Sequence, residues 1–169
     1  MKKRNLIIAF FASTLVGILG SCQNQPQTLV GQIDQLKQQV VADSTALYKL
    51  KTVDYQQLNT DFVYCDSLLQ YLSQEEVEAV FGTLNLTQAY LHQFGEVHPV
   101  MTQKTRFLLL QLDLLKADTE SQYLSDSLAH AYLDDENRVA DTLHNQVAYF
   151  KDRFDQCQKG LKTFKKNHK

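Results

Sequence analysis

Apolar residues at alternating steps of three and four constrain this chain more than any other feature. One such row near the C-terminus has no gap, and another near the N-terminus is interrupted only at Asp43. The rows comprise Leu29, Ile33, Leu36, Val40, Leu47 and Leu50, and then Leu143, Val147, Phe150, Phe154, Cys157, Leu161 and Phe164. This spacing is typical of heptad seams, along which helices pack side by side. The two seams therefore predict long α-helices.

Few residues in the chain favour turns, and those present divide it into four predicted helices. Ser73 and Glu76 form a capping-box pattern, which marks one helix start. Gly95 and Pro99 mark a second break, and the polar stretch 117–127 marks a third. The predicted helices span about 28–72, 74–94, 99–119 and 122–164.

The predicted fold is all-α, an antiparallel helical bundle. In an up-down-up-down chain the first and last helices run antiparallel, so their seams would face each other. A coiled-coil stalk of residues 28–50 with 143–164 would then carry a four-helix head, residues 51–142. An apolar row shifted by one residue begins at Tyr55, and its wider buried face is interpreted as the start of the head. Whether the first helix breaks near Asp43 stays open.

This arrangement separates the two cysteines of the helical domain. Cys65 would lie in the head and Cys157 in the stalk, tens of ångströms apart. A disulfide needs Cα atoms within about 7 Å of each other. We therefore expect two free, buried thiols that pack as small apolar side chains.

The N-terminal segment has the pattern of a targeting signal. Basic residues at 2–4 precede an uncharged apolar run over 6–19, which is short for a membrane span. The segment ends in Leu19-Gly20-Ser21-Cys22, which resembles the lipobox of bacterial lipoproteins. That resemblance implies a signal peptide over 1–21 and an acylated Cys22, with palmitate among its chains, as a lasting membrane anchor. The alternatives are a cleavable signal with a coincidental cysteine and an uncleaved membrane helix.

Residues 22–27 are polar and are interpreted as a lipidated tether to a single helical domain, 28–169. Gln23 rather than aspartate follows Cys22, and in lipoproteins this resemblance favours the outer membrane, facing the periplasm. Removal of residues 1–21, with three basic residues and no acidic one, leaves 14 basic against 19 acidic residues, a net charge of −5. An acidic domain of this kind argues against a nucleic-acid partner.

His92, Glu96 and His98 are the compact set that most resembles metal ligands, and they are weak candidates. Two residues on one helix face are too few to fix a metal, so no metal site is predicted. The alternative is a solvated turn in which His98 caps the next helix. Hydrolase motifs and glycine-rich phosphate loops are missing from the sequence, and the acids 134–136 are expected on a solvated helix face. We expect no catalytic residue, no enzyme activity and no cofactor.

The chain ends in a lysine-rich segment with no acid after Asp155: Lys159, Lys162, Lys165, Lys166 and Lys169. An antiparallel stalk would return this segment to the membrane that holds Cys22. There each lysine would gain up to about 1 kcal/mol from anionic headgroups. The alternative is a solvated helix end whose cations suit the helix dipole.

Four matches of Asp, then Ser or Thr, then a mostly apolar residue resemble the envelope O-glycosylation motif of Bacteroides-type bacteria. The hydroxyls are those of Ser44, Ser67, Ser127 and Thr142. The alternative is helix capping, in which the same residue types are common. With the polar tether, these sites resemble in style the small, uncharacterised helical lipoproteins of that group, and this resemblance implies no activity.

These patterns favour a lipid-anchored envelope scaffold or adaptor that presents its helical head to a protein partner. The alternative is a binding module whose helices enclose an apolar or metal ligand. A third reading is a homodimer formed through the stalk seam.

Overall fold

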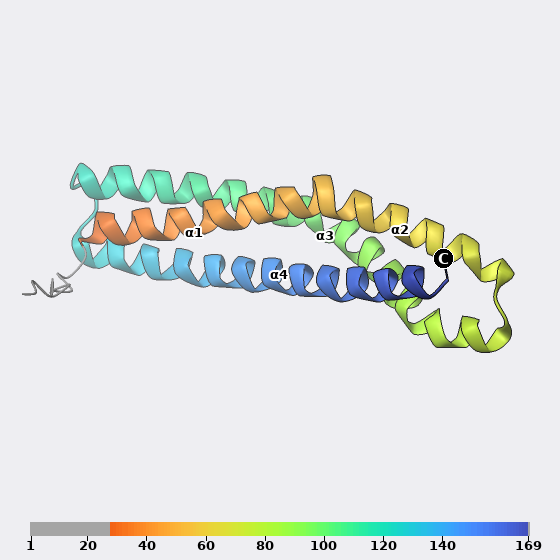
Figure 1. Ribbon diagram of the computed structural model, residues 1–169. Coiled ribbons are helices and arrows are strands. Elements are labelled where there is room, and N and C mark those ends of the chain that lie inside the picture. Colours follow the sequence, from red (N-terminus) through yellow and green to blue (C-terminus); the bar gives the residue numbers. More distant parts are fainter. Residues whose placement is uncertain (1–27, 169) are drawn as a thin grey trace, which may run out of the picture.

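The computed structural model describes residues 28–168, which form a bundle of three long helices (Figure 1). The first long helix comprises α1 (Leu29–Lys49), the π-helical turn η1 (Leu50–Asp54), α2 (Tyr55–Leu68) and the 3₁₀ turn η2 (Leu69–Tyr71). The second is α3 (Gln74–Glu120), and the third is α4 (Asp126–Asn167). The predicted all-helical fold is confirmed for these residues, which contain no strand.

Residues 1–27 and Lys169 lie outside the described part of the chain. The predicted signal peptide, the acylated Cys22 and the tether therefore remain predictions. Within 28–168, every helix is too short or too polar to span a bilayer.

Each long helix begins with a hydroxyl that accepts a backbone N–H of its first turn, which would otherwise lack a partner. Thr28 accepts from Gly31 at 3.2 Å, and Ser125 caps α4 in the same manner. Ser73 and Glu76 form the predicted capping box, since the Glu76 carboxylate accepts the Ser73 N–H at 2.8 Å. The residues next to each of these hydroxyls therefore determine where its helix begins.

The predicted break at Gly95 and Pro99 is wrong, because α3 continues through both residues. Proline inside a helix removes one hydrogen bond and costs about 3 kcal/mol. On both sides of it, however, α3 keeps one buried face at steps of three and four. That face comprises Val80, Leu84, Thr87, Leu91, Phe94, Met101, Thr105, Leu108, Leu112 and Leu115. Burial of this continuous face outweighs the lost hydrogen bond, so the two predicted helices are one.

A bundle of three helices brings the first and the last together in parallel. His144 Nδ1 lies 3.0 Å from the Asp43 carboxylate, and Lys165 Nζ lies 2.8 Å from that of Asp61. From the first pair to the second, the residue number rises in both helices, as it must for neighbours that run parallel. Figure 1 accordingly shows α1 and α4 starting at the same end of the bundle.

The predicted four-helix head on an antiparallel two-helix stalk is therefore replaced by one three-helix rod. Its 42-residue α4 is about 60 Å long at 1.5 Å per residue. Leu29 begins α1, whereas Phe164 lies in the last turn of α4 and precedes Lys165, which pairs with Asp61, so the two residues are not side by side. The end of α4 is consequently far from residue 28, where the predicted tether joins.

The one-residue shift in the apolar row of the first helix has a local cause. Leu50–Asp54 forms a π-helical turn, which takes in one extra residue, and Leu47 and Leu58 are buried on either side of it. The shift was interpreted as the wider buried face of a head. It is instead caused by a π turn in a bundle of three helices. α1 passes through Asp43 without a break.

Cys65 and Cys157 are free and buried, as predicted, although the reason differs. The ion pairs between the first helix and α4 place Cys157 level with residues near 55. Cys65 therefore lies about ten residues, or about 15 Å, farther along the rod. Burial raises the pKa of both thiols.

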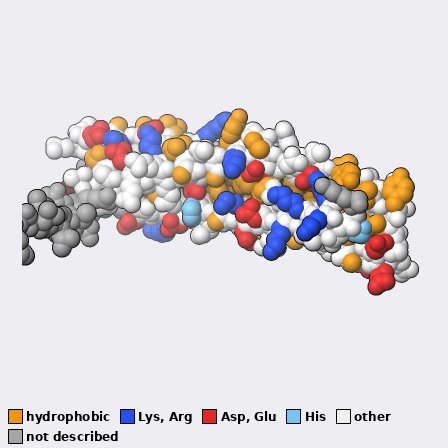
Figure 2. Space-filling model, in the orientation of Figure 1, with side chains coloured by type: hydrophobic (Ala, Val, Ile, Leu, Met, Phe, Trp, Pro, Cys, Tyr) orange, Lys and Arg blue, Asp and Glu red, His pale blue; other side chains and the backbone are white. Residues whose placement is uncertain are grey.

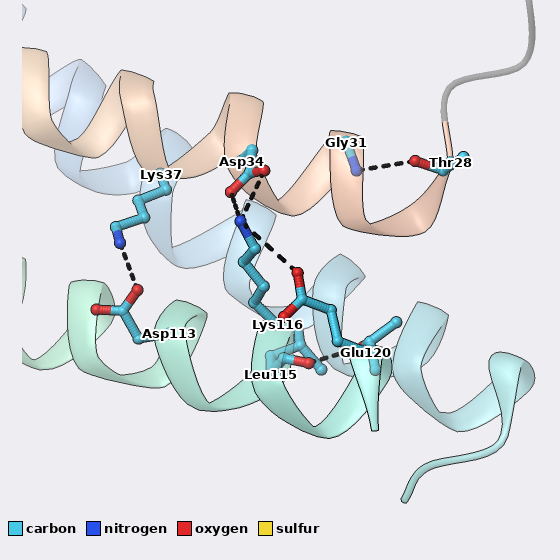
Figure 3. A network of polar contacts seen from close by, with 9 residues as sticks. Thr28, Gly31, Asp34, Lys37, Asp113, Leu115, Lys116 and Glu120 are labelled. Atoms are coloured by element: carbon cyan, nitrogen blue, oxygen red, sulfur yellow. Dashed lines mark hydrogen bonds and ion pairs between the residues drawn. The ribbon is translucent and has the colours of Figure 1, made fainter. Parts of the chain in front are cut away.

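Ion pairs join α1 to α3 along one side of the bundle (Figure 3). The Lys116 ammonium donates to the Asp34 carboxylate at 2.8 Å, which raises the pKa of Lys116, and Lys37 pairs with Asp113 one turn away. Each exposed pair contributes about 0.5 kcal/mol or less. Their main effect is to fix the antiparallel register of α1 against α3.

Candidate protein-binding face

The second half of α3 carries an apolar row on the side that faces away from the bundle. Its members are between 52 and 60 % exposed, and we call them the α3 outer row: Val100, Phe107, Leu110 and Leu114. They are seven, three and four residues apart, and Gln103 and Ala117 complete the heptad pattern. Figure 2 shows hydrophobic side chains at the surface along this edge. The row therefore has the spacing of a helix-packing seam that no helix within residues 28–168 covers.

A groove runs beside the row, between α3 and α4. It has a volume of about 440 Å³, and its lining is mostly apolar. Phe107 and Val139 form its exposed apolar walls, while Lys104 and Arg138 lie at its polar rim. Grooves of this form between two helices receive the apolar face of a third helix.

The charges that flank the row are divided along its length. Lys104 and Arg106 lie toward its first half, and Asp113, Asp118 and Glu120 lie toward its second half. Arg106 and Asp113 are on the flank facing α1, because Arg106 borders a small cavity with Ser44 and Asp113 pairs with Lys37. Lys104 is on the flank facing α4. The face is therefore basic at one end and acidic at the other.

The sequence contains a further signal for this row, which the two heptad seams do not show. Residues 107–115 read FLLLQLDLL, which is more apolar than one inward face of a helix can use. Leu108, Leu112 and Leu115 fill the core, and Phe107, Leu110 and Leu114 remain at the surface. A helix that is apolar on two faces normally has neighbours on both.

The three weak metal candidates do not converge on one point. His92 and Glu96 are exposed, with His92 Nδ1 3.5 Å from Glu96 Oε2, whereas His98 is half-buried and its ring centroid lies 5.3 Å from that of Phe94. Burial, with the charge of Lys51, lowers the pKa of His98. Residues 28–168 hold no group of three or more potential His, Cys, Asp or Glu ligands.

The C-terminal lysines cluster on the last part of α4 (Figure 2). Lys159, Lys162 and Lys166 border an open groove of about 420 Å³. Lys165 instead turns toward α2 and donates to Asp61, and this hydrogen bond raises its pKa. The geometric reason for expecting these lysines at the anchored end is wrong, since α4 ends at the opposite end of the rod.

The hydroxyls of the four glycosylation motifs lie in helices. Ser67, Ser127 and Thr142 are exposed, and Ser44 is half-buried. Ser67 donates to the Tyr64 carbonyl at 2.7 Å, and Thr142 donates to the Arg138 carbonyl at 2.9 Å. None of the four caps a helix, because Thr28, Ser73 and Ser125 hold those positions.

The remaining polar groups with unusual surroundings are scattered. Asp134 and Asp135 are exposed on α4, and Glu136 is half-buried, so that burial and the charge of Asp135 raise its pKa. One oxygen of the buried Asp43 and the hydroxyl of Tyr90 lack hydrogen-bond partners among residues 28–168, and burial raises the pKa of Tyr90. The ion pairs of Figure 3 imply that Asp43 and Tyr90 lie many residues apart along the rod. These groups therefore form no shared site.

Comparisons of the chain with protein-family models, with curated protein sequences and with solved structures gave no match. The residues of the chain itself are therefore the basis for inferring its function.

Proposed function

We propose that this chain is a lipid-anchored envelope scaffold or adaptor, without catalysis, whose three-helix rod offers the α3 outer row to a helix of a protein partner. The observation that carries this proposal is the heptad spacing of four exposed apolar side chains on one helix. Their burial against a fourth helix would remove apolar area from water at about 25 cal/mol per Å². The lipobox resemblance supports the anchor.

The chemistry of the face specifies the partner helix. The partner must carry apolar residues at heptad spacing, and its charges must complement the face. It therefore needs acidic residues opposite Lys104 and Arg106 and a basic residue opposite Asp113. The surface lies along the side of the rod rather than on a separate head.

A photoreactive amino acid at Leu110, in the full chain within intact envelopes, tests the surface. We expect a defined protein adduct from this position and none from the matched position Glu78, which is equally a surface position of α3 but outside the row. Adducts of equal yield from both positions, or from neither, would contradict a specific binding face.

The anchor is tested separately by Cys22→Ala. Native protein should incorporate labelled fatty acid and sediment with membranes, and the variant should do neither. A variant that still incorporates label would refute Cys22 as the lipidated residue.

A further inference from the structure

We infer that the helix received by the α3 outer row is the same row of a second copy of this chain, running antiparallel. This inference rests on the proposed function, because it takes the row to be the binding face and names its partner. The two-fold axis passes between Phe107 and Leu110, and each copy supplies the fourth helix of the other.

The charge distribution selects a second copy. The partner needs acid opposite the basic end of the row and base opposite its acidic end. A reversed copy of the same helix meets both requirements, because its own ends carry those charges in the opposite order. A parallel copy would place like charges together, which disfavours that orientation. A two-fold interface also uses the same patch on both subunits, as most homodimers do.

The heptad positions fix the register of the pair. Each heptad has two apolar positions. In an antiparallel coiled coil, the first apolar position of one helix packs against the second apolar position of the other helix. Phe107 of each copy then packs on Leu110 of the other, and Val100 packs on Ala117. Arg106 of each copy faces Asp113 of the other on the flank next to α1.

Other registers are excluded by the same charges. A slide of one heptad in one direction would place Asp113 opposite its own equivalent. A slide in the other direction would place Arg106 opposite its own equivalent. Asp113 already pairs with Lys37 within the chain (Figure 3). A carboxylate has two oxygens and several acceptor sites, so it can accept from Lys37 and from Arg106 of the second copy together.

Antiparallel pairing has a consequence for membrane geometry. Lys37 lies opposite Asp113 and Asp34 opposite Lys116, so the two-fold axis is level with residues near 42 of α1. Thr28 is about 20 Å from that level, and the two Thr28 residues of the dimer are therefore about 40 Å apart along the rods. Two rods that lie flat on the membrane would allow both anchors to insert. Anchoring in one membrane would also raise the effective concentration of the copies for each other.

Two differently tagged full-length copies in bacterial envelopes test the register by disulfide formation. One copy carries Val100→Cys and the other Ala117→Cys. We expect oxidation to join the two different copies efficiently and to join like copies poorly. Preferential joining of Val100→Cys to itself would indicate a parallel pair and overturn the inference.

A charge swap tests the specificity of the same interface. Arg106→Glu alone and Asp113→Lys alone each place two like-charged pairs in the homodimer, and self-capture should fall about tenfold or more. Coexpression of the two variants restores both opposite-charge pairs, so their mutual capture should return to the native level. Equal capture in all three combinations would refute a dimer through this face.

The outcomes separate this inference from the proposed function. A photoadduct of Leu110 with a different protein, together with failure of both copy-to-copy tests, would overturn the dimer and leave the adaptor intact. Loss of all Leu110 adducts would overturn both. Equal melting temperatures of Arg106→Glu and native protein show that the variant is folded.

Discussion

Two phenylalanines on one helix provide the sharpest test of the structure. Phe94 is fully buried between the three helices, and its ring centroid lies 5.1 Å from that of Phe150 and 5.7 Å from that of Tyr90. Phe107, 13 residues later on α3, is 60 % exposed. Truncation of each to alanine removes the same atoms from the same type of helix. The difference between the two costs therefore measures packing alone.

The expected costs differ severalfold. Phe94→Ala loses the transfer free energy of the ring and leaves a cavity, which together cost about 3–5 kcal/mol. Its aromatic contacts, at about 0.5–1.5 kcal/mol per pair, favour the upper part of that range. Phe107→Ala loses only a partly buried ring in a chain without a bound partner, and should cost about 1 kcal/mol or less.

Urea unfolding of the full chain, followed by helical circular dichroism at high dilution, measures both costs. With a denaturant slope of about 2 kcal/mol per molar, Phe94→Ala should lower the unfolding midpoint by about 2 M, and Phe107→Ala by less than about 0.5 M. In envelopes the order should reverse, since Phe107→Ala should abolish crosslinking through the α3 outer row. If Phe107→Ala costs as much stability as Phe94→Ala, α3 is rotated about its axis and both proposals fail.

Two further predictions concern the middle and the far end of the rod. A Cβ at Gly160 would lie 2.6 Å from Thr83 Cγ2, so Gly160→Ala should destabilise by about 1–3 kcal/mol, and Thr83→Ser should restore part of this. As the control, a Cβ at Gly82 would have no atom within 4 Å, so Gly82→Ala should stabilise the folded chain by about 0.5–1 kcal/mol. Thermal unfolding measures both effects. Burial and Lys51 hold the pKa of His98 below its unfolded value of 6.5, so the unfolded state takes up a proton first as the pH falls. Stability should therefore be full above pH 6.5 and decline below it, and urea titrations should show a weaker decline for His98→Gln than for the native chain.

Local chemistry made much of the fold predictable. The capping box at Ser73 and Glu76 required only the identities of two residues, and its helix start is confirmed. The seam from Leu143 to Phe164 predicted the buried face of α4, and all of its members are buried. Such features depend on neighbours three or four positions away, which a sequence displays directly.

The π turn at Leu50–Asp54 shows where local information ends. The sequence displayed its effect, a one-residue shift in the apolar row, but not its cause. A shift of this kind fits either an extra residue in the helix or a change in the number of packed helices. The choice depends on the helices that pack against it, which the row itself does not specify.

The α3 outer row was not predicted from the sequence, because one buried stripe was expected on each helix. Leu108 and Leu110 are equally apolar, and only the placement of α1 and α4 decides which of them is covered. The excess of leucine over 107–115 was the available signal. It predicts a second neighbour for this helix, and the charges of Arg106 and Asp113 then indicate which neighbour.

The status of Pro99 determines the direction of every later element. A break there adds a helix to the count, and each added helix reverses the direction of the next. Four predicted helices, an even number, placed the last helix antiparallel to the first. The C-terminal lysines were therefore expected near the predicted membrane anchor. With α3 continuous, the count is odd, α4 runs parallel to α1, and Lys166, next to the Lys165 that pairs with Asp61, lies about 50 Å from residue 28, where the predicted tether joins. Burial of the unbroken face from Leu84 to Leu115 outweighs the one hydrogen bond that Pro99 removes. This balance of free energies therefore decides which end of the molecule is basic.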